Sequence, residues 1–386
     1  MLYRKLGRTG LDVGIIGLGA EHLEYEPEEA VRPVVDEAIA GGVNYIDLFM
    51  PSPGIRDIFG RVLKGRRSSV MIAGHLGAAY KDSQYYRTRD REYSEKYFHD
   101  LLSRLHTEYI DILMLHFIDT KEEYDTAFGQ GSLLELALKL KAEGKARFLG
   151  MSSHRAEASL RAVKSGFIDV LMFPVNPAFD MLPGEVELEE LWKENPYKQL
   201  EMNEFTPVFG RRELYRECER QGVGIVVMKP YAGGWLFRRE NPSSLVLTPA
   251  QCLDYSLSRP GVSTVVPGCK TAGQMREALA YLNASADERD YGRIISGSKW
   301  RLKGACMYCN HCLPCPAGLD IAAVTRLADS AGHSATKNMR LSYESLNVKA
   351  SECIECGACM ERCPFGVDAV QNMKRAAGLF ELRQPD

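Results

Sequence analysis

The sequence contains no apolar run long enough to cross a membrane. A membrane-spanning helix needs about 20 consecutive apolar residues, and no run in the 386 residues approaches that length. The opening residues, MLYRKLGRTG, also lack the apolar core of a secretory signal peptide. These two absences predict a cytoplasmic protein.

A large excess of charge of either sign is lacking as well. The chain has 48 Lys and Arg against 51 Asp and Glu, which gives a net charge of -3. Binding to nucleic acids or acidic membranes usually depends on a strong basic excess. We therefore expect neither nucleic acid nor membrane among the partners.

Cysteines are plentiful but unevenly distributed. Eight of the eleven lie between Cys306 and Cys363, and the others, Cys218, Cys252 and Cys269, are scattered. Disulfide frameworks belong mainly to small secreted proteins, whereas cysteines clustered at two-residue gaps are typical of metal sites in a reducing compartment. The clustering therefore predicts metal chemistry in the C-terminal part of the chain.

Short apolar runs alternate with amphipathic helical patterns over residues 1–284. Each run is too short for a helix and too continuous for a half-exposed strand, so it predicts a strand buried on both faces. Eight such strands alternating with helices favour a closed (β/α)8 TIM barrel. The leading residues, YRKLGRTGLDVG, predict a β-hairpin. The predicted strands lie in 15–19, 45–49, 70–74, 110–116, 148–152, 170–176, 224–228 and 263–268, and the clearest helices in 27–42, 91–106 and 133–145.

Two segments interrupt this alternation. A long polar insertion at about 178–210 follows the sixth strand. Loops of that length in a compact domain more often have a functional role than not. We expect it to cover the barrel mouth, with an uninvolved surface elaboration as the alternative. The charged segment 285–304 predicts a helical linker, and residues 305–386 predict a separate small α-helical and loop domain.

The small domain carries two cysteine quartets, each followed by a proline. Triads of cysteines at two-residue gaps with a trailing Cys-Pro are typical of ferredoxin-like modules that bind two [4Fe–4S] clusters, in which the last cysteine ligates the other cluster. We therefore expect crossed ligation, with zinc sites as the alternative. His311 lies inside the first quartet. It either adjusts the reduction potential of the cluster through a hydrogen bond or is an exposed residue with no role in the site. The two ligand sets are Cys306, Cys309, Cys312 and Cys363, and Cys353, Cys356, Cys359 and Cys315.

Several motifs along the chain resemble the aldo/keto reductase superfamily, in its branch with a C-terminal ferredoxin domain. The matching barrel segments are YRKLGRTGLDV, GVNYIDLF, YIDILMLHFID, FLGMSSH, GIVVMKPYAGG and VVPGCKTAGQMREAL. The matching cluster segments are CMYCNHCLPCPAGLDI and ECIECGACMERCPFGV. The resemblance covers nearly the whole chain and implies an oxidoreductase.

The resemblance also implies a catalytic tetrad of Asp, Tyr, Lys and His, of which only half is present. Asp47 and His116 occupy the positions of the Asp and the His. Ser52 or Pro53 stands where the family has its proton-donating Tyr, and Gly74-His75 replaces the segment that carries the Lys. Carbonyl reduction needs a general acid near the oxygen, so we expect this protein not to use the standard Tyr/Lys mechanism of the family.

The nicotinamide-binding positions that the resemblance implies are also only partly retained. Ser152 remains, but Ser153 replaces the family's Asn and Met172 its Gln. Phosphate binding is still expected where backbone N–H groups meet a helix N-terminus. The candidate cofactor-binding residues are Ser152, Ser153, Lys229, Gly268, Lys270, Thr271, Gln274 and Glu277, with Arg276 as a further cation.

Polar residues collect at the predicted strand ends, where this fold carries catalysis. We expect Asp47, His75 and His116 to converge, with one histidine donating a proton and Asp47 fixing its tautomer. The alternative is a metal site made by the histidines and Glu21. Tyr80, Tyr85 and Tyr86 follow the third strand, either as packing residues of a loop or as a replacement phenol. The other strand-end candidates are His22, His154, Asn176 and Lys229.

Three functional hypotheses follow. The first is an iron–sulfur oxidoreductase whose clusters exchange electrons with a small organic substrate at the barrel mouth, with a ferredoxin or flavodoxin as redox partner. The second is an NAD(P)H-dependent reductase with a substituted tetrad, and the third a non-enzymatic electron-transfer partner. Nicotinamide moves two electrons as hydride and a cluster moves one, so a link between them usually needs a flavin. NADP(H) and a flavin are therefore both candidate cofactors beside the clusters.

Overall fold

The computed structural model describes residues 1–180, 210–239, 245–297 and 303–382, and the chain divides into two compact units. The first unit comprises Met1–Val175, Val223–Pro230 and Ser263–Ala284. The second comprises Asn176–Gly222, Tyr231–Val262 and Ser285–Asp386.

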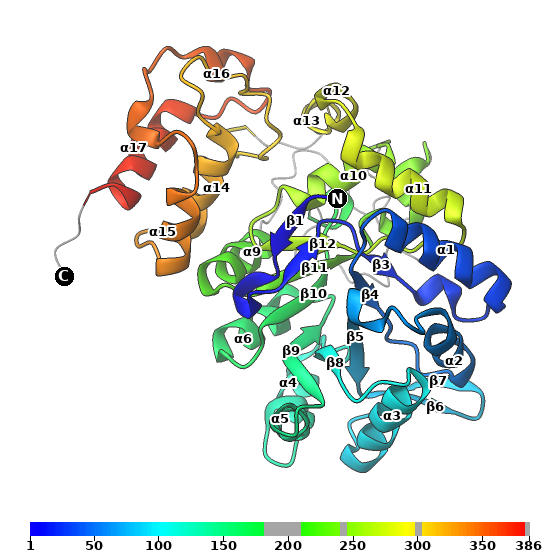
Figure 1. The fold of residues 1–386 in the computed structure, drawn as a ribbon. Helices are drawn as coiled ribbons and strands as arrows, with labels where there is room; N and C mark the ends of the chain where they lie inside the picture. The colour runs from blue at the N-terminus through cyan, green and yellow to red at the C-terminus, as the bar shows by residue number, and fades with distance from the viewer. Residues whose placement is uncertain (181–209, 240–244, 298–302, 383–386) are drawn as a thin grey trace. The chain divides into compact units, whose positions relative to one another are not determined.

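Eight parallel strands form a barrel, as predicted (Figure 1). Their order is β12-β11-β10-β9-β8-β5-β4-β3, and the two edges meet through hydrogen bonds from Gly17 N to Val265 O (2.7 Å) and from Gly19 N to Pro267 O (3.1 Å). The strands are β3 (Leu18–Gly19), β4 (Tyr45–Asp47), β5 (Met71–Leu76), β8 (Ile110–Leu115), β9 (Ala146–Ser152), β10 (Val170–Pro174), β11 (Gly224–Met228) and β12 (Val262–Val265).

The barrel forms from these runs because their side chains are buried on both faces. Every residue of β5 and β8 is buried. Side chains such as Met71, Met114 and Met172 from different strands pack in one core cluster. The predicted N-terminal hairpin, β1 (Tyr3–Lys5) paired with β2 (Asp12–Gly14), adds Leu6 and Val13 to the same cluster. The hairpin therefore packs onto the apolar interior of the barrel.

Helices follow the strands and surround them. Polar caps begin several of these helices; for example, Asp90 accepts a hydrogen bond from Tyr93 N (2.7 Å) at the start of α3. The three clearest sequence predictions of helices are confirmed as α1, α3 and α5. The helices are α1 (Glu28–Ala40), α2 (Pro53–Val62), α3 (Arg91–Arg104), α4 (Lys121–Phe128), α5 (Leu133–Ala142), α6 (Ala156–Ser165) and α11 (Ala272–Ala280).

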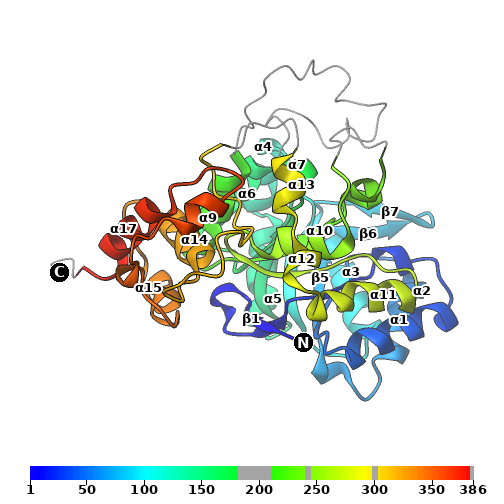
Figure 2. The same cartoon turned by 90° about the horizontal axis from the view of Figure 1, so that it is seen from above.

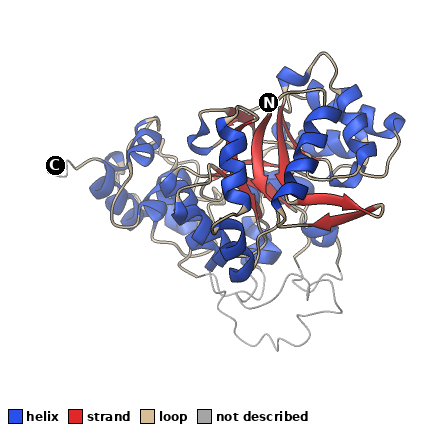
Figure 3. Ribbon diagram, turned by 90° about the horizontal axis from the view of Figure 1, so that it is seen from below, coloured by secondary structure: helices blue, strands red, loops and turns tan. Residues whose placement is uncertain are grey.

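The segment after β5 departs from the sequence prediction of a loop. It forms an antiparallel hairpin of β6 (Ala78–Lys81) and β7 (Gln84–Arg87) that extends beyond the other strands (Figure 3). Asp82 and Ser83 join the strands with φ of 52° and 60°. Two successive positive φ values are the mark of a tight hairpin turn, and Asp tolerates that conformation.

The second unit is mainly helical. Helix α14 packs against α17, and apolar residues such as Val324, Leu327 and Met373 form its core together with Cys359 (Figure 2). Its helices are α7 (Pro177–Asp180), α9 (Gly210–Gln221), α10 (Pro249–Leu257), α12 (Ala286–Arg289), α13 (Gly292–Ser296), α14 (Ile321–Ala331), α15 (Lys337–Glu344), α16 (Ala358–Arg362) and α17 (Ala369–Phe380).

Two of the predicted segments are only partly described. Most of the insertion at 178–210 lies outside the described residues, and so does its predicted position over the barrel mouth. Within 285–304, α12 and α13 confirm helical structure up to Ser296, whereas the boundaries between barrel, linker and small domain stay a prediction. Among the described residues, no helix combines the length and apolar character that crossing a membrane requires.

Candidate active site and cluster-binding loops

Three side chains at the carboxyl ends of the barrel strands and one tyrosine of the β6–β7 hairpin form a continuous hydrogen-bonded chain. Asp47 Oδ1 at the end of β4 lies 3.0 Å from His75 Nε2 on β5. His75 Nδ1 lies 2.8 Å from Nδ1 of His116, which follows β8. His116 Nε2 lies 2.5 Å from the hydroxyl of Tyr85 on β7. The predicted convergence of Asp47, His75 and His116 is thus present, and Tyr85 extends it.

The chain of four residues runs from a buried carboxylate to a phenol at the surface. Asp47, His75 and His116 are 5%, 6% and 5% exposed, whereas Tyr85 is 37% exposed. Phe49 packs against the chain, with its ring stacked on that of His116 at 5.5 Å and 16°. Water is therefore excluded from the inner three groups, and an outside molecule has access to Tyr85.

Burial determines the protonation of the outer two groups. It lowers the pKa of His116 well below its usual value of 6.5, and the neighbouring His75 lowers it further. His116 is consequently neutral near pH 7. Burial also raises the pKa of Tyr85 to about 12, so this phenol keeps its proton.

The three tyrosines that follow the third strand have different surroundings. The backbone carbonyl of Tyr80 accepts a hydrogen bond from Tyr93 (3.4 Å), and the ring of Tyr86 contacts that of Tyr93. Tyr85 instead reaches His116. The pattern AAYK-DS-QYYR, two short runs around a turn, was the signal in the sequence that could have identified the hairpin.

The other strand-end histidines lie apart from this chain. His22 packs on Gly268, where an added Cβ would lie 2.2 Å from the imidazole. His154 Nδ1 is 3.0 Å from Asp119, and its Nε2 is 3.0 Å from Nζ of Lys229. Of the four strand-end histidines, only His75 and His116 are joined by a hydrogen bond in this chain.

The alternative of a metal site gains no support from the geometry. Glu21 begins a short 3-10 helix, Glu21–Leu23. Within the described parts of the chain, no three His, Cys, Asp or Glu side chains come together as ligands of a single ion.

The strand-end candidate Asn176 makes a local contact, because its side chain accepts a hydrogen bond from Phe179 N (2.9 Å).

The candidate nicotinamide-binding serines already have partners within the protein. Ser152 Oγ accepts a hydrogen bond from Phe117 N (2.9 Å), and Ser153 Oγ donates one to Asp119 (3.0 Å). Both residues are buried, and Met172 belongs to the barrel core. Binding a carboxamide here would compete with these contacts.

The candidate phosphate loop lies at the N-terminus of α11. Thr271 Oγ1 caps the helix by accepting from Gln274 N (3.2 Å), and the Gln274 side chain accepts from Lys270 N (2.7 Å). Gly268, Lys270 and Glu277 are exposed. Arg276 pairs with Glu37 at 2.7 Å. The loop is open to an anion, but several of its groups already satisfy one another.

The cysteines of the second unit come together across the two motifs. Cys315 of the first motif lines one pocket with Cys353, Cys356 and Cys359 of the second, between apolar side chains that include Leu319. Burial raises the pKa of the Cys309 thiol to about 11, and the nearby Cys363 thiol adds to this shift. Four sulfur donors in an apolar pocket match the donor set of an iron–sulfur cluster.

Comparisons with known proteins identify both parts of the chain. Residues 11–251 match the model of the aldo/keto reductase family, and residues 298–364 match that of the 4Fe-4S dicluster domain. The chain is 28% identical over 297 residues to the uncharacterized oxidoreductase YqkF of Bacillus subtilis, covering 74% of this chain and 92% of the relative. It is 25% identical over 315 residues to L-galactose dehydrogenase of Arabidopsis thaliana, covering 72% and 86%.

Solved structures agree with the barrel assignment. The holo form of aldo-keto reductase AKR11C1 from Bacillus halodurans superimposes with a TM-score of 0.57 at 23% identity, covering 75% of this chain and 94% of that one. At this identity the likeness concerns the fold. The family match spans well over half of the sequence. The chain is therefore an oxidoreductase of the aldo/keto reductase family that carries a 4Fe-4S dicluster domain.

Proposed function

We propose that the protein is an iron–sulfur oxidoreductase whose ferredoxin-like module exchanges electrons with a redox reaction on a small organic substrate at the barrel mouth. The observation that carries the proposal is the hydrogen-bonded chain from Asp47 to Tyr85, which ends on an accessible phenol. A chain of this kind can deliver a proton to a substrate oxygen. A carbonyl compound is the corresponding substrate class.

Two clusters are assigned to the module on the crossed pattern. Cys315, Cys353, Cys356 and Cys359 line one pocket, which supports their role as one ligand set. The other set is Cys306, Cys309, Cys312 and Cys363. Two such clusters would supply two electrons, one at a time, which is the number that converts a carbonyl into an alcohol.

This reduction requires two protons: the hydrogen-bonded chain supplies the one that goes to the carbonyl oxygen, and water at the open barrel mouth supplies the one that goes to carbon. When His75 carries a proton on both nitrogens, it donates to Asp47 and to His116 Nδ1. His116 Nε2–H then donates to the Tyr85 oxygen, and the Tyr85 O–H points to the substrate. These directions follow because each nitrogen of a neutral imidazole is either a donor or an acceptor.

Proton transfer reverses the direction of two hydrogen bonds in the chain, the one between His75 and His116 and the one between His116 and Tyr85. Tyr85 gives its proton to the substrate oxygen and receives the Nε2 proton of His116, which in turn receives the Nδ1 proton of His75. The final state has a neutral His75 whose Nε2–H still donates to Asp47. The high pKa of Tyr85 makes a lasting phenolate costly, and this return of a proton avoids it.

The second candidate function is NAD(P)H-dependent carbonyl reduction, with Tyr85 in place of the family's missing Tyr. The contact between Tyr85 and His116 favours it, since a phenol is again positioned beside the family's His. The internal hydrogen bonds of Ser152 and Ser153 argue against tight nicotinamide binding. A flavin bound at the loop 268–277 is a further electron source consistent with the open helix N-terminus.

Single-turnover oxidation separates these functions. The full chain is loaded with clusters under anaerobic conditions, reduced with dithionite, freed of excess reductant and mixed with benzaldehyde and other simple aldehydes and ketones. The proposal predicts that cluster absorbance returns as alcohol forms, without NADPH. Alcohol formation that depends on NADPH, with clusters unchanged, would support the second function instead.

A matched pair of variants tests the proton donor in the same assay. Tyr85→Phe removes the terminal hydroxyl and should slow alcohol formation about 100-fold, the usual effect of losing a general acid. Tyr86→Phe changes the adjacent, exposed tyrosine of the same strand and should have little effect. Equal rates for the two variants would contradict the role of Tyr85.

A further inference from the structure

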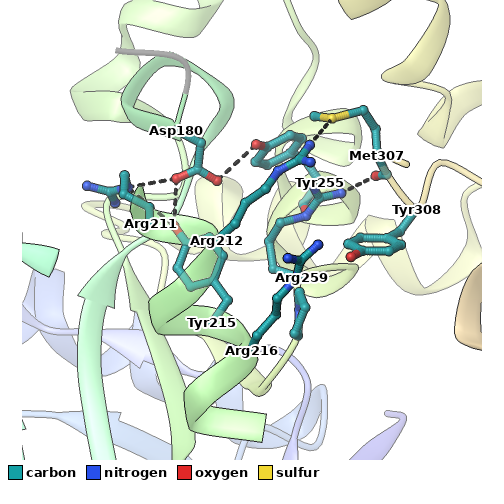
Figure 4. A pocket seen from close by; sticks show the side chains of 10 residues that line it. Asp180, Arg211, Arg212, Tyr215, Arg216, Tyr255, Arg259, Met307 and Tyr308 are labelled. Atoms are coloured by element: carbon teal, nitrogen blue, oxygen red, sulfur yellow. Dashed lines mark hydrogen bonds and ion pairs between the residues drawn. The ribbon is translucent and has the colours of Figure 1, made fainter. Parts of the chain in front are cut away.

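A buried arginine lies directly behind the first cysteine motif. Arg259 follows α10, is 3% exposed and donates to the backbone carbonyl of Met307, which lies between Cys306 and Cys309. The hydroxyl of Tyr291 donates to the same carbonyl at 2.6 Å. Arg259 therefore holds the loop that presents these two cysteines (Figure 4).

The hydrogen-bond partners given for this arginine are neutral, and the nearby acid, Asp180, acts on it without a direct ion pair among the described contacts. Its guanidinium donates to the Ser258 hydroxyl (2.8 Å) and the Tyr255 carbonyl (3.1 Å), and it lies 4.2 Å from the centre of the Tyr255 ring and 5.2 Å from that of Tyr308. These groups are neutral.

The surrounding pocket is positive as a whole. Four arginines and one acid, Asp180, are among its lining residues, and Asp180 is paired with Arg211 at 2.8 Å (Figure 4). Arg216 lies 3.4 Å from Asp329, and the hydroxyl of Tyr308 donates to the same carboxylate. The pocket therefore presents a net positive charge beside Cys306 and Cys309.

A second group faces a ligand of the same cluster. His311 Nδ1 lies 3.3 Å from Sγ of Cys309, and its Nε2 lies 3.0 Å from Asp290. Gly292 makes room for this arrangement, because an added Cβ would lie 2.8 Å from the His311 Nδ1 atom. Asp290 thus holds the imidazole with one nitrogen directed at the sulfur.

The other ligand set has different surroundings. Its pocket is lined by apolar side chains such as Ile321, Val370 and Met373, and Cys356 is exposed. Glu355 of the same pocket is paired with Lys374 at 2.7 Å. Arg362 also lines it but is exposed and donates to the backbone carbonyl of Cys312 at 2.6 Å.

We propose that the two clusters differ in reduction potential, and that the cluster held by Cys306, Cys309, Cys312 and Cys363 has the higher one. Reduction adds one negative charge to a cluster, and nearby positive charge and hydrogen bonds to ligand sulfur stabilise the reduced form. Arg259 and His311 supply both to the first cluster. An electron that enters the module therefore resides mainly on that cluster. This inference rests on the two-cluster assignment of the proposed function.

Redox titration of the cluster-loaded full chain, followed by electron paramagnetic resonance, tests the proposal. Dithionite is the reductant. The native protein should give two midpoints, and Cys356→Ser should alter the signal of the lower one, because this residue belongs to the second ligand set. Perturbation of the higher midpoint by Cys356→Ser would overturn the assignment.

Variants around the first cluster provide the second readout. Arg259→Met should weaken its reduction equilibrium roughly tenfold, which corresponds to about 59 mV for one electron. Arg259→Lys retains the charge and should restore most of the potential. His311→Phe should lower the same midpoint. Because His311 is less buried than Arg259, this variant keeps the test valid if the Arg259→Met protein fails to assemble its clusters. Lys374→Met, a change beside the second ligand set, should leave the higher midpoint unchanged.

The outcomes also separate this inference from the proposed function. An unchanged higher midpoint in both Arg259→Met and His311→Phe would refute the inference, even if aldehydes still oxidise the reduced clusters. About four iron atoms per chain instead of about eight would refute the two-cluster assignment itself, and the inference with it.

Discussion

His116 should make the native protein less stable as the pH falls below its usual pKa. Its ring is 5% exposed, and burial together with His75, Arg89, His154 and Arg87 lowers its pKa well below 6.5. The unfolded chain binds a proton at this histidine near pH 6.5, whereas the native chain resists doing so. The stability that depends on the neutral ring is therefore present above pH 6.5 and is lost at lower pH.

The size of the effect follows from this one proton. Once the unfolded chain is protonated and the native chain is not, the free energy of unfolding falls by about 1.4 kcal/mol per pH unit. The loss attributable to His116 between pH 7 and pH 5 is accordingly at most about 2 kcal/mol, which is reached if the native ring stays neutral throughout this range. Other groups add their own pH dependence, so the comparison of interest is between native protein and variant.

Urea unfolding followed by far-ultraviolet circular dichroism measures the difference. We expect His116→Phe, which can keep the stacking on Phe49, to lose less stability than the native protein between pH 7 and pH 5, by up to about 2 kcal/mol. His99→Gln changes an exposed histidine on α3 and should behave like the native protein. Parallel pH profiles for the native protein and His116→Phe would refute the claim that this ring is held neutral.

Three further predictions concern the cofactors and the acid. Iron and acid-labile sulfide should each reach about eight per chain after anaerobic reconstitution, and stoichiometric zinc without sulfide would contradict this. NADPH should bind weakly, because Ser152 and Ser153 are engaged internally; submicromolar affinity by calorimetry would show otherwise. His75→Ala and His116→Ala should each reduce the rate of alcohol formation in the aldehyde assay about 100-fold without changing cluster content, and unchanged rates would exclude a role in proton transfer.

Much of the barrel could be predicted because burial on two faces leaves a strong pattern in the sequence. Each apolar run overlaps one of the eight strands. The meeting of Asp47, His75 and His116 was also predictable, since parallel strands that neighbour one another end at the same edge of the barrel. The hairpin of β6 and β7 was missed because its second strand is fully exposed and carries no apolar alternation.

The position of Tyr85 depends on structure that no local pattern encodes. Three neighbouring tyrosines are equivalent by sequence, and only the folding of the hairpin beside β8 directs one of them to His116. The same holds for Arg259, which is distant in sequence from the cysteine motif whose loop it holds. Contacts of this kind join elements far apart along the chain, and their geometry is determined by packing.

The sequence by itself determined the fold class, the family and the cysteines available as cluster ligands, because periodic burial and fixed spacings are local properties of the chain. The tertiary structure decided which side chains meet. Hydrogen bonds such as those that join Asp47, His75, His116 and Tyr85 form only within about 3 Å, and that distance depends on the mutual placement of four separate elements. Local pattern therefore specifies which groups are available, and packing specifies which of them can act together.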